Sequence, residues 1–420
     1  MAEQKNNNQE NLTPRPKLGR GVIAIIVVVF LLIGGVIVGY PYYKTYIAPW
    51  YEPVLTVRND VFNRRYFMKI LRLHMTGSEK DKFAVTMRVI EKIQEAALIE
   101  QEAVKRKINV SDEEVNREIR RRVLEAGKGE GNFKDLYANL LRGMRLSKKT
   151  YAHLVKQDLY KIKLLNSFKK EIPDQAEEVH LYAIVAGGEG KMEELRRRLR
   201  RGEDFQKLAR EESINLVSSK KGGELGWFPK KVDDRMVDEQ VRLKGILTKT
   251  KKEAEIIRKR ILAGEDFAKL AKKFSRDDAS RAKGGYLGWV STRYEKGGKQ
   301  YAAESFDLKP GALSEPIDTS EGFWITRVLE KVPEGKFIDD YAFSLDIGKV
   351  SPPLLVSGSY YLIKVVAREK RALTKKHKQI LAEKALKKWL KDSATKGSNE
   401  GWIKWNWGSE ALNWSLGHLQ

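Results

Sequence analysis

The sequence predicts an α+β protein in which an apolar helix and an all-helical domain precede two related α/β copies. Three observations indicate this class. Residues 21–43 carry no charge, residues 53–170 place apolar side chains mostly at helical spacing, and the region that follows repeats one phrase, in which a helical pattern leads to a short strand bounded by glycines. At 420 residues the chain is long enough for two or three domains.

Composition limits the classes of partner and site. The chain has 80 Lys and Arg against 56 Asp and Glu, a net charge of +24. Such a balance favours nucleic acid, phospholipid headgroups or wall polymers as partners. Solvated helix faces are the simpler interpretation, because the basic runs at 117–122 and 196–201 lie in helical patterns mixed with glutamates. Without cysteine there is no disulfide, thiolate metal site or cysteine nucleophile, and we expect no metal or cofactor.

The apolar segment at 21–43 is predicted to be a single transmembrane helix. Residues 22–38 are mostly Val, Ile, Leu and Phe, which is long enough to cross a bilayer. A cleaved signal peptide would have a shorter apolar stretch and a small-residue cleavage site, and a buried core helix is the other alternative. The aromatic residues that follow are typical of a membrane interface: Tyr40, Tyr42, Tyr43, Tyr46, Trp50 and Tyr51.

The charges on either side of this segment predict its orientation. Residues 1–20 form a polar tail, predicted to be disordered, that carries Arg15, Lys17 and Arg20, whereas only Lys44 closely follows the segment. The positive-inside rule then places the tail in the cytoplasm and the rest outside the plasma membrane. Later cations reduce this asymmetry, at Arg58, Arg64 and Arg65.

Residues 53–170 are predicted to form the helical domain, with residues 54–57 as a candidate short strand at its start. Ser111 opens a capping box, and a basic amphipathic helix at 372–393 is expected to return to this domain. His74 and His153 have no partner visible in the sequence. The tail at 396–420 contains Trp402, Trp405, Trp407 and Trp414, which suit either docking on the core or a membrane interface.

The repeated phrase comes in an opening and a closing half. The opening half, G-E-D-F followed by G-G-x-L-G-W, starts at Gly202 and again 62 positions later at Gly264. Strands at 179–185 and 241–248 are predicted before the two copies. The closing half occurs at 305–328 and again 37 positions later at 342–365. The equivalent pairs are Phe306 and Phe343, Gly311 and Gly348, Ser314 and Ser351, Pro316 and Pro353, and Val328 and Val365.

The order of these halves predicts an insertion. A tandem duplication would alternate openings and closings, but here two openings precede two closings. We therefore expect an inserted copy, 241–336, within an outer copy made of 177–240 plus 337–368; chains tolerate such insertions at exposed loops. An interleaved arrangement is the alternative, and it would place the 241–247 strand beside the 361–366 strand.

The repeated phrase, together with F-x-L-x-x-G-x-x-S-x-P and a final G-x-x-I-x-x-V strand, resembles the parvulin family of peptidyl-prolyl cis-trans isomerases. The N-terminal motifs V-L-T-V-R-N-D-V-F, A-L-I-E-Q-E-A and V-S-D-E-E-V resemble the helical chaperone domain of SurA- and PrsA-type foldases. Together the two resemblances cover residues from roughly 53 to 395.

The parvulin resemblance also implies a site. The family has two histidines facing it, but here those positions hold Ala183 and Tyr361 in the outer copy and Gly245 and Trp324 in the inserted copy. His180 should project from the opposite face of its strand and not substitute.

The inserted copy matches more of the family pattern than the outer copy does. Asp278 and Thr319 match polar catalytic positions, and Leu287 and Tyr301, with Trp324 and Gly245, are predicted to bind substrate. Core packing is the alternative for Leu287 and Tyr301, and a solvated loop carboxylate is the alternative for Asp278. The outer copy has Leu216 at the acidic position.

The resemblance implies a membrane-anchored, extracytoplasmic folding factor that isomerises prolyl bonds in unfolded, proline-containing exported polypeptides. One alternative is a catalytically silent holdase that uses both parvulin-like copies as binding surfaces. Another is a basic anchor protein for nucleic acid or wall polymer, although no nucleic-acid recognition motif is present and no specific nucleic acid is expected.

Overall fold

The computed structural model describes residues 25, 28–29, 34–37, 39–75, 81–128, 130–292 and 300–418. The predicted tail at 1–20 and about half of the predicted transmembrane segment at 21–43 lie outside these residues. Within the described ranges, none of the helices combines the length and apolar character that crossing a bilayer requires. The chain divides into two compact units, Met1–Phe168 with Ala385–Gln420 (unit 1) and Lys169–Lys384 (unit 2).

Unit 1 consists mainly of helices that enclose a core containing Phe67, Met68, Leu98 and Leu164. The helices are α2 (Arg64–His74), α3 (Lys82–Lys105), α4 (Asp112–Ala126), α5 (Phe133–Met144), most of α6 (Lys148–Glu171), the second part of α14 (Lys375–Asn399) and α15 (Ser409–Gly417). Two short helical turns, η1 (Tyr43–Ile47) and η2 (Ala48–Tyr51), precede them. The capping box predicted at Ser111 is present at the start of α4.

The prediction of an all-helical domain was wrong, because unit 1 contains a three-stranded sheet. Its strands are β1 (Pro53–Val57), β2 (Asp60–Asn63) and β13 (Ile403–Trp405), in the order β13-β1-β2. The third strand comes from the C-terminal tail, with Leu55 opposite Trp405. A local sequence pattern cannot reveal a partner so distant along the chain.

The tryptophan-rich tail docks on the core of unit 1. Besides β13, the indole of Trp405 donates a 2.7 Å hydrogen bond to the Gln94 side chain, and the ring of Trp407 lies edge-on to Phe67 at 4.8 Å between centroids. Docking was one of the two roles left open for these indoles.

Unit 2 contains two antiparallel four-stranded sheets. The first, β11-β12-β3-β4, combines β3 (Gln175–Ala186), β4 (Glu224–Pro229), β11 (Leu354–Val356) and β12 (Ser359–Ala372). The second, β7-β6-β9-β8, combines β6 (Gln240–Thr248), β7 (Tyr286–Ser291), β8 (Ile317–Thr319) and β9 (Gly322–Val332). The helices that follow β3 are α7 (Glu189–Arg200), α8 (Phe205–Glu212) and α9 (Leu216–Ser219). Those that follow β6 are α10 (Lys251–Leu262), α11 (Phe267–Phe274) and α12 (Asp278–Arg281).

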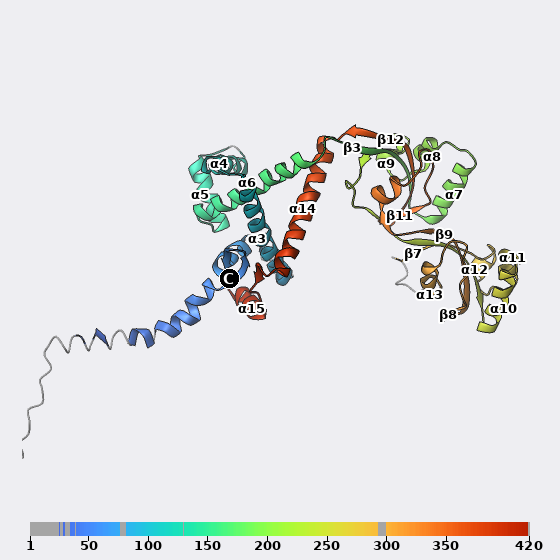
Figure 1. Ribbon diagram of the computed structural model, residues 1–420, viewed down its shortest axis with the longest axis horizontal. Helices are drawn as coiled ribbons and strands as arrows, with labels where there is room; N and C mark the ends of the chain where they lie inside the picture. Colours follow the sequence, from blue (N-terminus) through green and yellow to red (C-terminus); the bar gives the residue numbers. More distant parts are fainter. Residues whose placement is uncertain are drawn as a thin grey trace, which may run out of the picture. The chain divides into compact units, whose positions relative to one another are not determined.

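The strand pairing joins segments that are far apart in the sequence. β12 runs beside β3 although the whole second sheet lies between them in the chain (Figure 1), and β6 pairs with β9. These are the pairings that a nested arrangement requires. Between the two sheets, β5 (Met236–Val237) and β10 (Gly335–Lys336) pair with each other, so the chain enters and leaves the inserted copy side by side.

The structure explains why the G-E-D-F phrase recurs. In each copy the glutamate binds an arginine of the preceding helix, Glu203 with Arg198 and Glu265 with Arg260. The aspartate then caps the next helix: Asp204 accepts from the Lys207 amide at 2.8 Å, and Asp266 from the Lys269 amide at 2.7 Å. The phenylalanine that follows is buried in both copies. The phrase is therefore a helix-to-helix corner.

The second glycine of G-G-x-L-G-W allows two backbones to approach closely. A Cβ atom at Gly223 would lie 2.5 Å from the Ala183 carbonyl oxygen, and one at Gly285 would lie 2.8 Å from that of Gly245. In return, the Ala183 amide donates to Gly223 and the Gly245 amide to Gly285, at 2.8 and 2.7 Å. Both glycines have positive φ, which other residues rarely adopt.

Two glutamates of α7 tie the outer copy to the inserted copy, and we call these contacts the α7 clasp. Glu189 accepts the backbone N–H of Trp289 at 3.0 Å, and Glu193 accepts its indole N–H at 2.9 Å. Because β7 is an edge strand, these carboxylates satisfy donors that no neighbouring strand reaches. Trp289 also packs in the hydrophobic cluster of the outer copy, beside Leu181 and Phe337.

We predict that Glu193→Ala lowers the free energy of unfolding of the full chain by about 1–3 kcal/mol, because it leaves the buried indole of Trp289 without its acceptor and removes one of the two carboxylates that pair with Arg242. Urea denaturation followed by tryptophan fluorescence measures this. The control is Glu255→Ala at an exposed position of α10, expected to change stability by less than about 0.5 kcal/mol. Equal effects of the two substitutions would contradict a stabilising clasp.

Candidate active site

Four of the predicted substrate-binding residues gather in the inserted copy, and we call them the aromatic cluster: Gly245, Leu287, Tyr301 and Trp324. They come from β6, β7, α13 (Gln300–Ala303) and β9. The rings of Tyr301 and Trp324 lie 4.6 Å apart at 38°, and Leu287 packs against the same core. Residues separated by as many as 79 positions thus form one apolar cluster, in which Gly245, Tyr301 and Trp324 are buried and Leu287 is partly buried.

The absence of a side chain at Gly245 allows Leu287 and Trp324 to pack beside it. A Cβ atom there would lie 2.5 Å from Leu287 Cδ1 and 2.9 Å from the Trp324 ring. Both distances are shorter than van der Waals contact allows, so the indole and the leucine occupy the space that a side chain at 245 would need. The two positions at which the parvulin family carries histidines are therefore coupled here by volume, one empty and the other filled by an indole.

The polar atoms of Trp324 and Tyr301 differ from exposed ones in hydrogen bonding and in pKa. Trp324 is 2% exposed, and its indole nitrogen has no hydrogen-bond partner in the part of the chain that the structure describes. Burial, together with the Asp277 and Glu321 carboxylates, raises the pKa of Tyr301 to about 12. The phenol is therefore a neutral donor throughout the physiological pH range.

The structure does not place Asp278 in contact with the aromatic cluster. Its side chain is 82% exposed and pairs with Arg281 on α12 at 2.6 Å. The carboxylate that acts on Tyr301 belongs to the preceding residue, Asp277, which also caps α12 through the Ser280 amide at 2.9 Å. The sequence signal for Asp277 was its position before a short helix, where aspartate is a favoured cap.

Thr319 shapes the turn between β8 and β9. Its hydroxyl donates to the Gly322 carbonyl at 2.7 Å and accepts from the Glu321 amide at 3.3 Å. These bonds fix the backbone that carries Glu321 and then Trp324. The described contacts of Thr319 therefore indicate a positioning role, and a catalytic role for it stays a prediction.

In the outer copy, the residues equivalent to Gly245 and Trp324 are Ala183 and Tyr361, and both pack in the hydrophobic core. Tyr361 packs against Phe337 at 5.3 Å between centroids, and the Arg235 guanidinium lies 4.5 Å from the Phe337 ring and 5.9 Å from the Tyr361 ring. Asp233 holds that guanidinium in a 2.6 Å ion pair. Ala183 is buried in the same cluster. A cation thus lies near the ring of Tyr361, which corresponds to Trp324, and near the adjacent Phe337 ring.

His180 lies away from this surface, as the strand alternation predicted. Its ring stacks on Trp227 at 4.8 Å, and its Nε2 contacts the Glu224 carboxylate at 2.8 Å. Leu216, at the acidic position of the outer copy, is exposed. The outer copy therefore presents neither a histidine nor a carboxylate at the positions that the family pattern designates.

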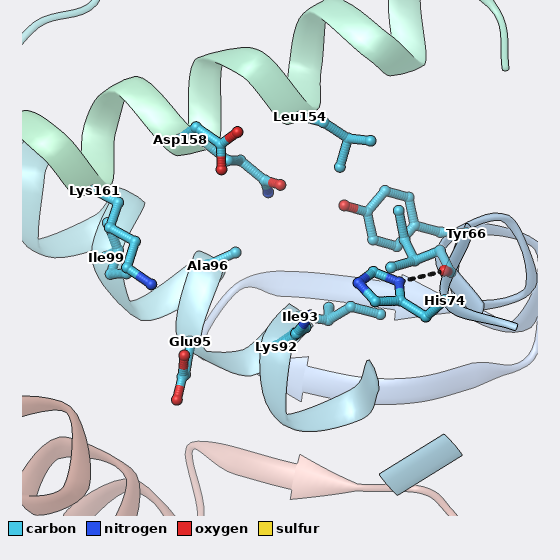
Figure 2. Close-up of a pocket in the computed structure, with 12 residues that line it drawn as sticks. Tyr66, His74, Lys92, Ile93, Glu95, Ala96, Ile99, Leu154, Asp158 and Lys161 are labelled. Atoms are coloured by element: carbon cyan, nitrogen blue, oxygen red, sulfur yellow. Dashed lines mark hydrogen bonds between the residues drawn. The ribbon is translucent and has the colours of Figure 1, made fainter. Parts of the chain in front are cut away.

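Unit 1 contains a separate groove between α2, α3 and α6. It contains a cavity of about 380 Å³. Figure 2 shows Tyr66 and His74 from α2 facing Leu154 and Asp158 from α6. A second cavity of about 780 Å³ shares His74, Leu154 and Asp158 with the first. His74 is held by the Ile70 carbonyl at 2.9 Å. The two cavities are adjacent, and the apolar lining of the first comes from Ile70, Ile93, Ala96, Ile99 and Leu154.

The chain matches three family models. Residues 242–330 and 185–244 match PPIC-type PPIase domains, and residues 15–165 match a SurA-like N-terminal domain. The chain carries a SurA-like N-terminal domain and PPIC-type parvulin domains. The resemblance inferred from the motifs is thereby confirmed. The stronger parvulin pattern recognised in the inserted copy agrees with the longer of the two PPIC-type matches.

Named relatives cover only part of the chain. It is 36% identical over 128 residues to a foldase protein PrsA of Geobacillus sp. (strain WCH70), covering 30% of this chain and 46% of the relative. It is 35% identical over 109 residues to a parvulin-like PPIase of Rickettsia prowazekii (strain Madrid E), covering 25% and 38%. The chain thus spans less than half the length of each of these relatives.

A solved structure also resembles part of the chain. The parvulin of Nitrosopumilus maritimus is 32% identical and covers 22% of this chain and 97% of its own, with a TM-score of 0.21. Because this TM-score is low, the assignment of the SurA-like and PPIC-type domains rests on the sequence matches.

The pair Gly245 and Trp324 generates a stability prediction. Gly245→Ala should lower the free energy of unfolding by about 1–3 kcal/mol, because the new methyl group overpacks Leu287 and the indole. Adding Trp324→Tyr gives the inserted copy the same pair of residues as Ala183 and Tyr361 of the outer copy. We expect the double variant to recover at least half of the free energy of unfolding that Gly245→Ala loses. Urea denaturation of the single and double variants measures both effects. A double variant less stable than Gly245→Ala would show that the two positions are not coupled by volume.

Proposed function

We propose that the chain is a folding factor that accelerates cis-trans isomerisation of prolyl bonds, and that the inserted copy carries this activity. The observation that supports the proposal is the gathering of Leu287, Tyr301 and Trp324 within the stretch that matches a PPIC-type PPIase domain. The relatives named as PrsA foldase and parvulin-like PPIase support the same activity.

The chemistry requires no covalent intermediate. The barrier of about 20 kcal/mol arises from amide resonance, so a catalyst must stabilise a twisted imide. Apolar walls such as Leu287 and the two rings suit a proline ring, and they leave the adjacent carbonyl poorly solvated, which disfavours the planar amide. The Tyr301 phenol, protonated because its pKa is about 12, is the candidate hydrogen-bond donor to the substrate.

The proposed setting is the outer face of the plasma membrane, with residues 21–43 as a single-pass anchor and residues 1–20 in the cytoplasm. The uninterrupted apolar run and the cations before it support this. The proposed substrates are unfolded, proline-containing exported polypeptides, and neither a cofactor nor a specific nucleic acid partner is part of the proposal.

A second function, holding unfolded chains without isomerising them, is favoured by a different observation. The groove of unit 1 offers apolar side chains in cavities of about 380 and 780 Å³, enough to receive side chains of an extended or helical client segment. The two functions are compatible, since they use different parts of the chain.

We predict that the full chain in detergent micelles accelerates isomerisation of a prolyl tetrapeptide in a protease-coupled assay, with kcat/KM constant between about pH 6 and pH 9. No histidine occurs between residues 241 and 336, and the neighbouring phenol titrates only near pH 12, so no group of the aromatic cluster changes charge in that range. A rate equal to the uncatalysed one would remove the isomerase proposal. A profile that falls below pH 7 would place a histidine in the reaction.

For the groove, we predict that Ala96→Glu raises severalfold the amount of chain needed to suppress aggregation of an unfolded client. Ala96 lines the cavity, and a carboxylate there would have to be desolvated when an apolar client binds. Light scattering of a chemically denatured client diluted into buffer measures the effect. Asn139→Glu, at an exposed position of α5, is the control with the same charge change. Suppression that is equally strong in both variants would exclude the groove as the client site.

A further inference from the structure

Three cations of unit 1 line one small cavity, which we call the basic pocket. Arg65, Lys69 and Arg72 lie on α2 at spacings of four and three residues, which places them on one face of the helix. The opposite walls come from η1 and η2, and the cavity has a volume of about 440 Å³. Its remaining lining residues are Tyr46, Ile47, Trp50 and Tyr51.

The charge of the basic pocket is not neutralised by the described part of the chain. The nearby carboxylate of Glu52 is engaged by Arg64 at 2.6 Å. Arg65 donates to the Tyr51 hydroxyl at 3.2 Å and Arg72 to the His418 carbonyl at 2.9 Å, both neutral acceptors. Among the described residues, no acidic side chain lines the pocket. Three positive charges that converge on one cavity without a carboxylate favour an anionic ligand.

The aromatic wall of the basic pocket is held from behind by the C-terminal tail. The ring of Trp50 lies edge-on to Trp414 at 4.8 Å and to His418 at 5.5 Å between centroids. Trp414 and His418 stack on each other at 4.1 Å. Trp50 is thus fixed against Trp414 of α15 and against His418, whereas the other aromatic lining residues, Tyr46 and Tyr51, are exposed.

The position of the basic pocket in the chain indicates which anion it meets. η1 begins at Tyr43, the last residue of the apolar segment at 21–43. The tyrosines before the pocket, Tyr40, Tyr42 and Tyr43, have exposed rings, as residues at a membrane–water interface do. Arginine forks and a lysine ammonium are suited to phosphate oxygens.

We propose that the basic pocket binds the phosphate group of an anionic phospholipid headgroup. The two arginines and Lys69 contact the phosphate oxygens, while Trp50 and Tyr46 lie at the level of the headgroups. The choice of a lipid over a free phosphate rests on the proposed membrane anchor; the choice of a phosphate rests on the pocket alone. Binding there would hold unit 1 against the membrane through folded structure in addition to the anchor.

The test uses the full chain in nonionic detergent micelles, titrated with phosphatidylglycerol that carries brominated acyl chains, with quenching of tryptophan emission as the signal. Brominated phosphatidylcholine and inorganic phosphate form the other two arms. The test variant is Arg65→Gln with Lys69→Gln and Arg72→Gln. Its matched control is Lys134→Gln with Lys387→Gln and Lys391→Gln, three exposed lysines of the same unit. Lys69→Glu alone is a second variant, since the Lys69 ammonium makes no hydrogen bond within the described ranges.

We expect phosphatidylglycerol to bind wild type more tightly than phosphatidylcholine, and the triple pocket variant to lose at least about tenfold in affinity relative to the triple control, because each cation near an anionic surface contributes about fivefold. Trp50→Phe should reduce the quenching. Equal affinities for the two lipids, or equal losses in the two triple variants, would overturn the proposal. Displacement of the lipid by inorganic phosphate at similar concentration would also overturn the assignment to a lipid.

Flotation of the chain with phosphatidylcholine vesicles separates this proposal from the anchor. A chain that does not float but still prefers phosphatidylglycerol in micelles contradicts the anchor and supports the phosphate pocket. A chain that floats but shows no preference contradicts the pocket and leaves the anchor supported. The isomerase assay is independent of both results.

Discussion

The two-residue ribbon of β5 and β10 is the constraint on which unit 2 depends. Gly335 lies opposite Val237, and Lys336 opposite Met236, so the chain leaves the inserted copy beside the point where it entered. The chain then continues to β12, which pairs with β3 and completes the first sheet. The α7 clasp then adds contacts from the other side, with Glu189 and Glu193 on Trp289. An insertion with paired ends and a second contact surface behaves as part of the structure that holds it.

This arrangement separates two roles that a pair of identical domains would share. In the outer copy, Arg235 covers Phe337 and Tyr361, and its hydrophobic cluster takes in Trp289 and Val332 from the inserted copy. That copy therefore has the features of a scaffold. In the inserted copy, the absence of a side chain at Gly245 leaves space for Leu287 and Trp324. Gly245 and Trp324 occupy the two positions at which the family pattern would place histidines, and they belong to an apolar cluster.

Much of unit 2 was predictable from the sequence because a constant spacing between repeated motifs identifies residues with equivalent positions in the two copies. The offsets of 62 and 37 residues identified equivalent residues of the two cores, and the alternation of β3 correctly separated His180 from Ala183. A catalytic role for Asp278 stays a prediction, and the motif does not show how two adjacent carboxylates differ in exposure: Asp278 is exposed, whereas Asp277 is half-buried. That depends on the cap of α12, where Asp277 holds the Ser280 amide.

What the sequence could not show are contacts between surfaces far apart in the chain. The clasp requires the docking of α7 on β7, and the sheet of unit 1 requires a strand from the tail to reach β1. The basic pocket is of the same kind. Of its three cations, the sequence analysis noted only Arg65, as one of the charges that weaken the topology prediction. The structure separates Arg64, which pairs with Glu52, from Arg65, which lines the cavity.

The most direct test of the central claim compares two leucines at equivalent positions of the two copies. Leu287 and Leu225 are both partly buried against the hydrophobic cluster of their own copy. Exchange spectroscopy by NMR on a prolyl peptide, with catalytic amounts of the full chain, reports the isomerisation rate directly. The account predicts that Leu287→Ala lowers that rate by about tenfold, equivalent to about 1.4 kcal/mol of lost transition-state stabilisation, and that Leu225→Ala leaves it unchanged. Equal rates in the two variants, or a larger loss in Leu225→Ala, would contradict an active site in the inserted copy.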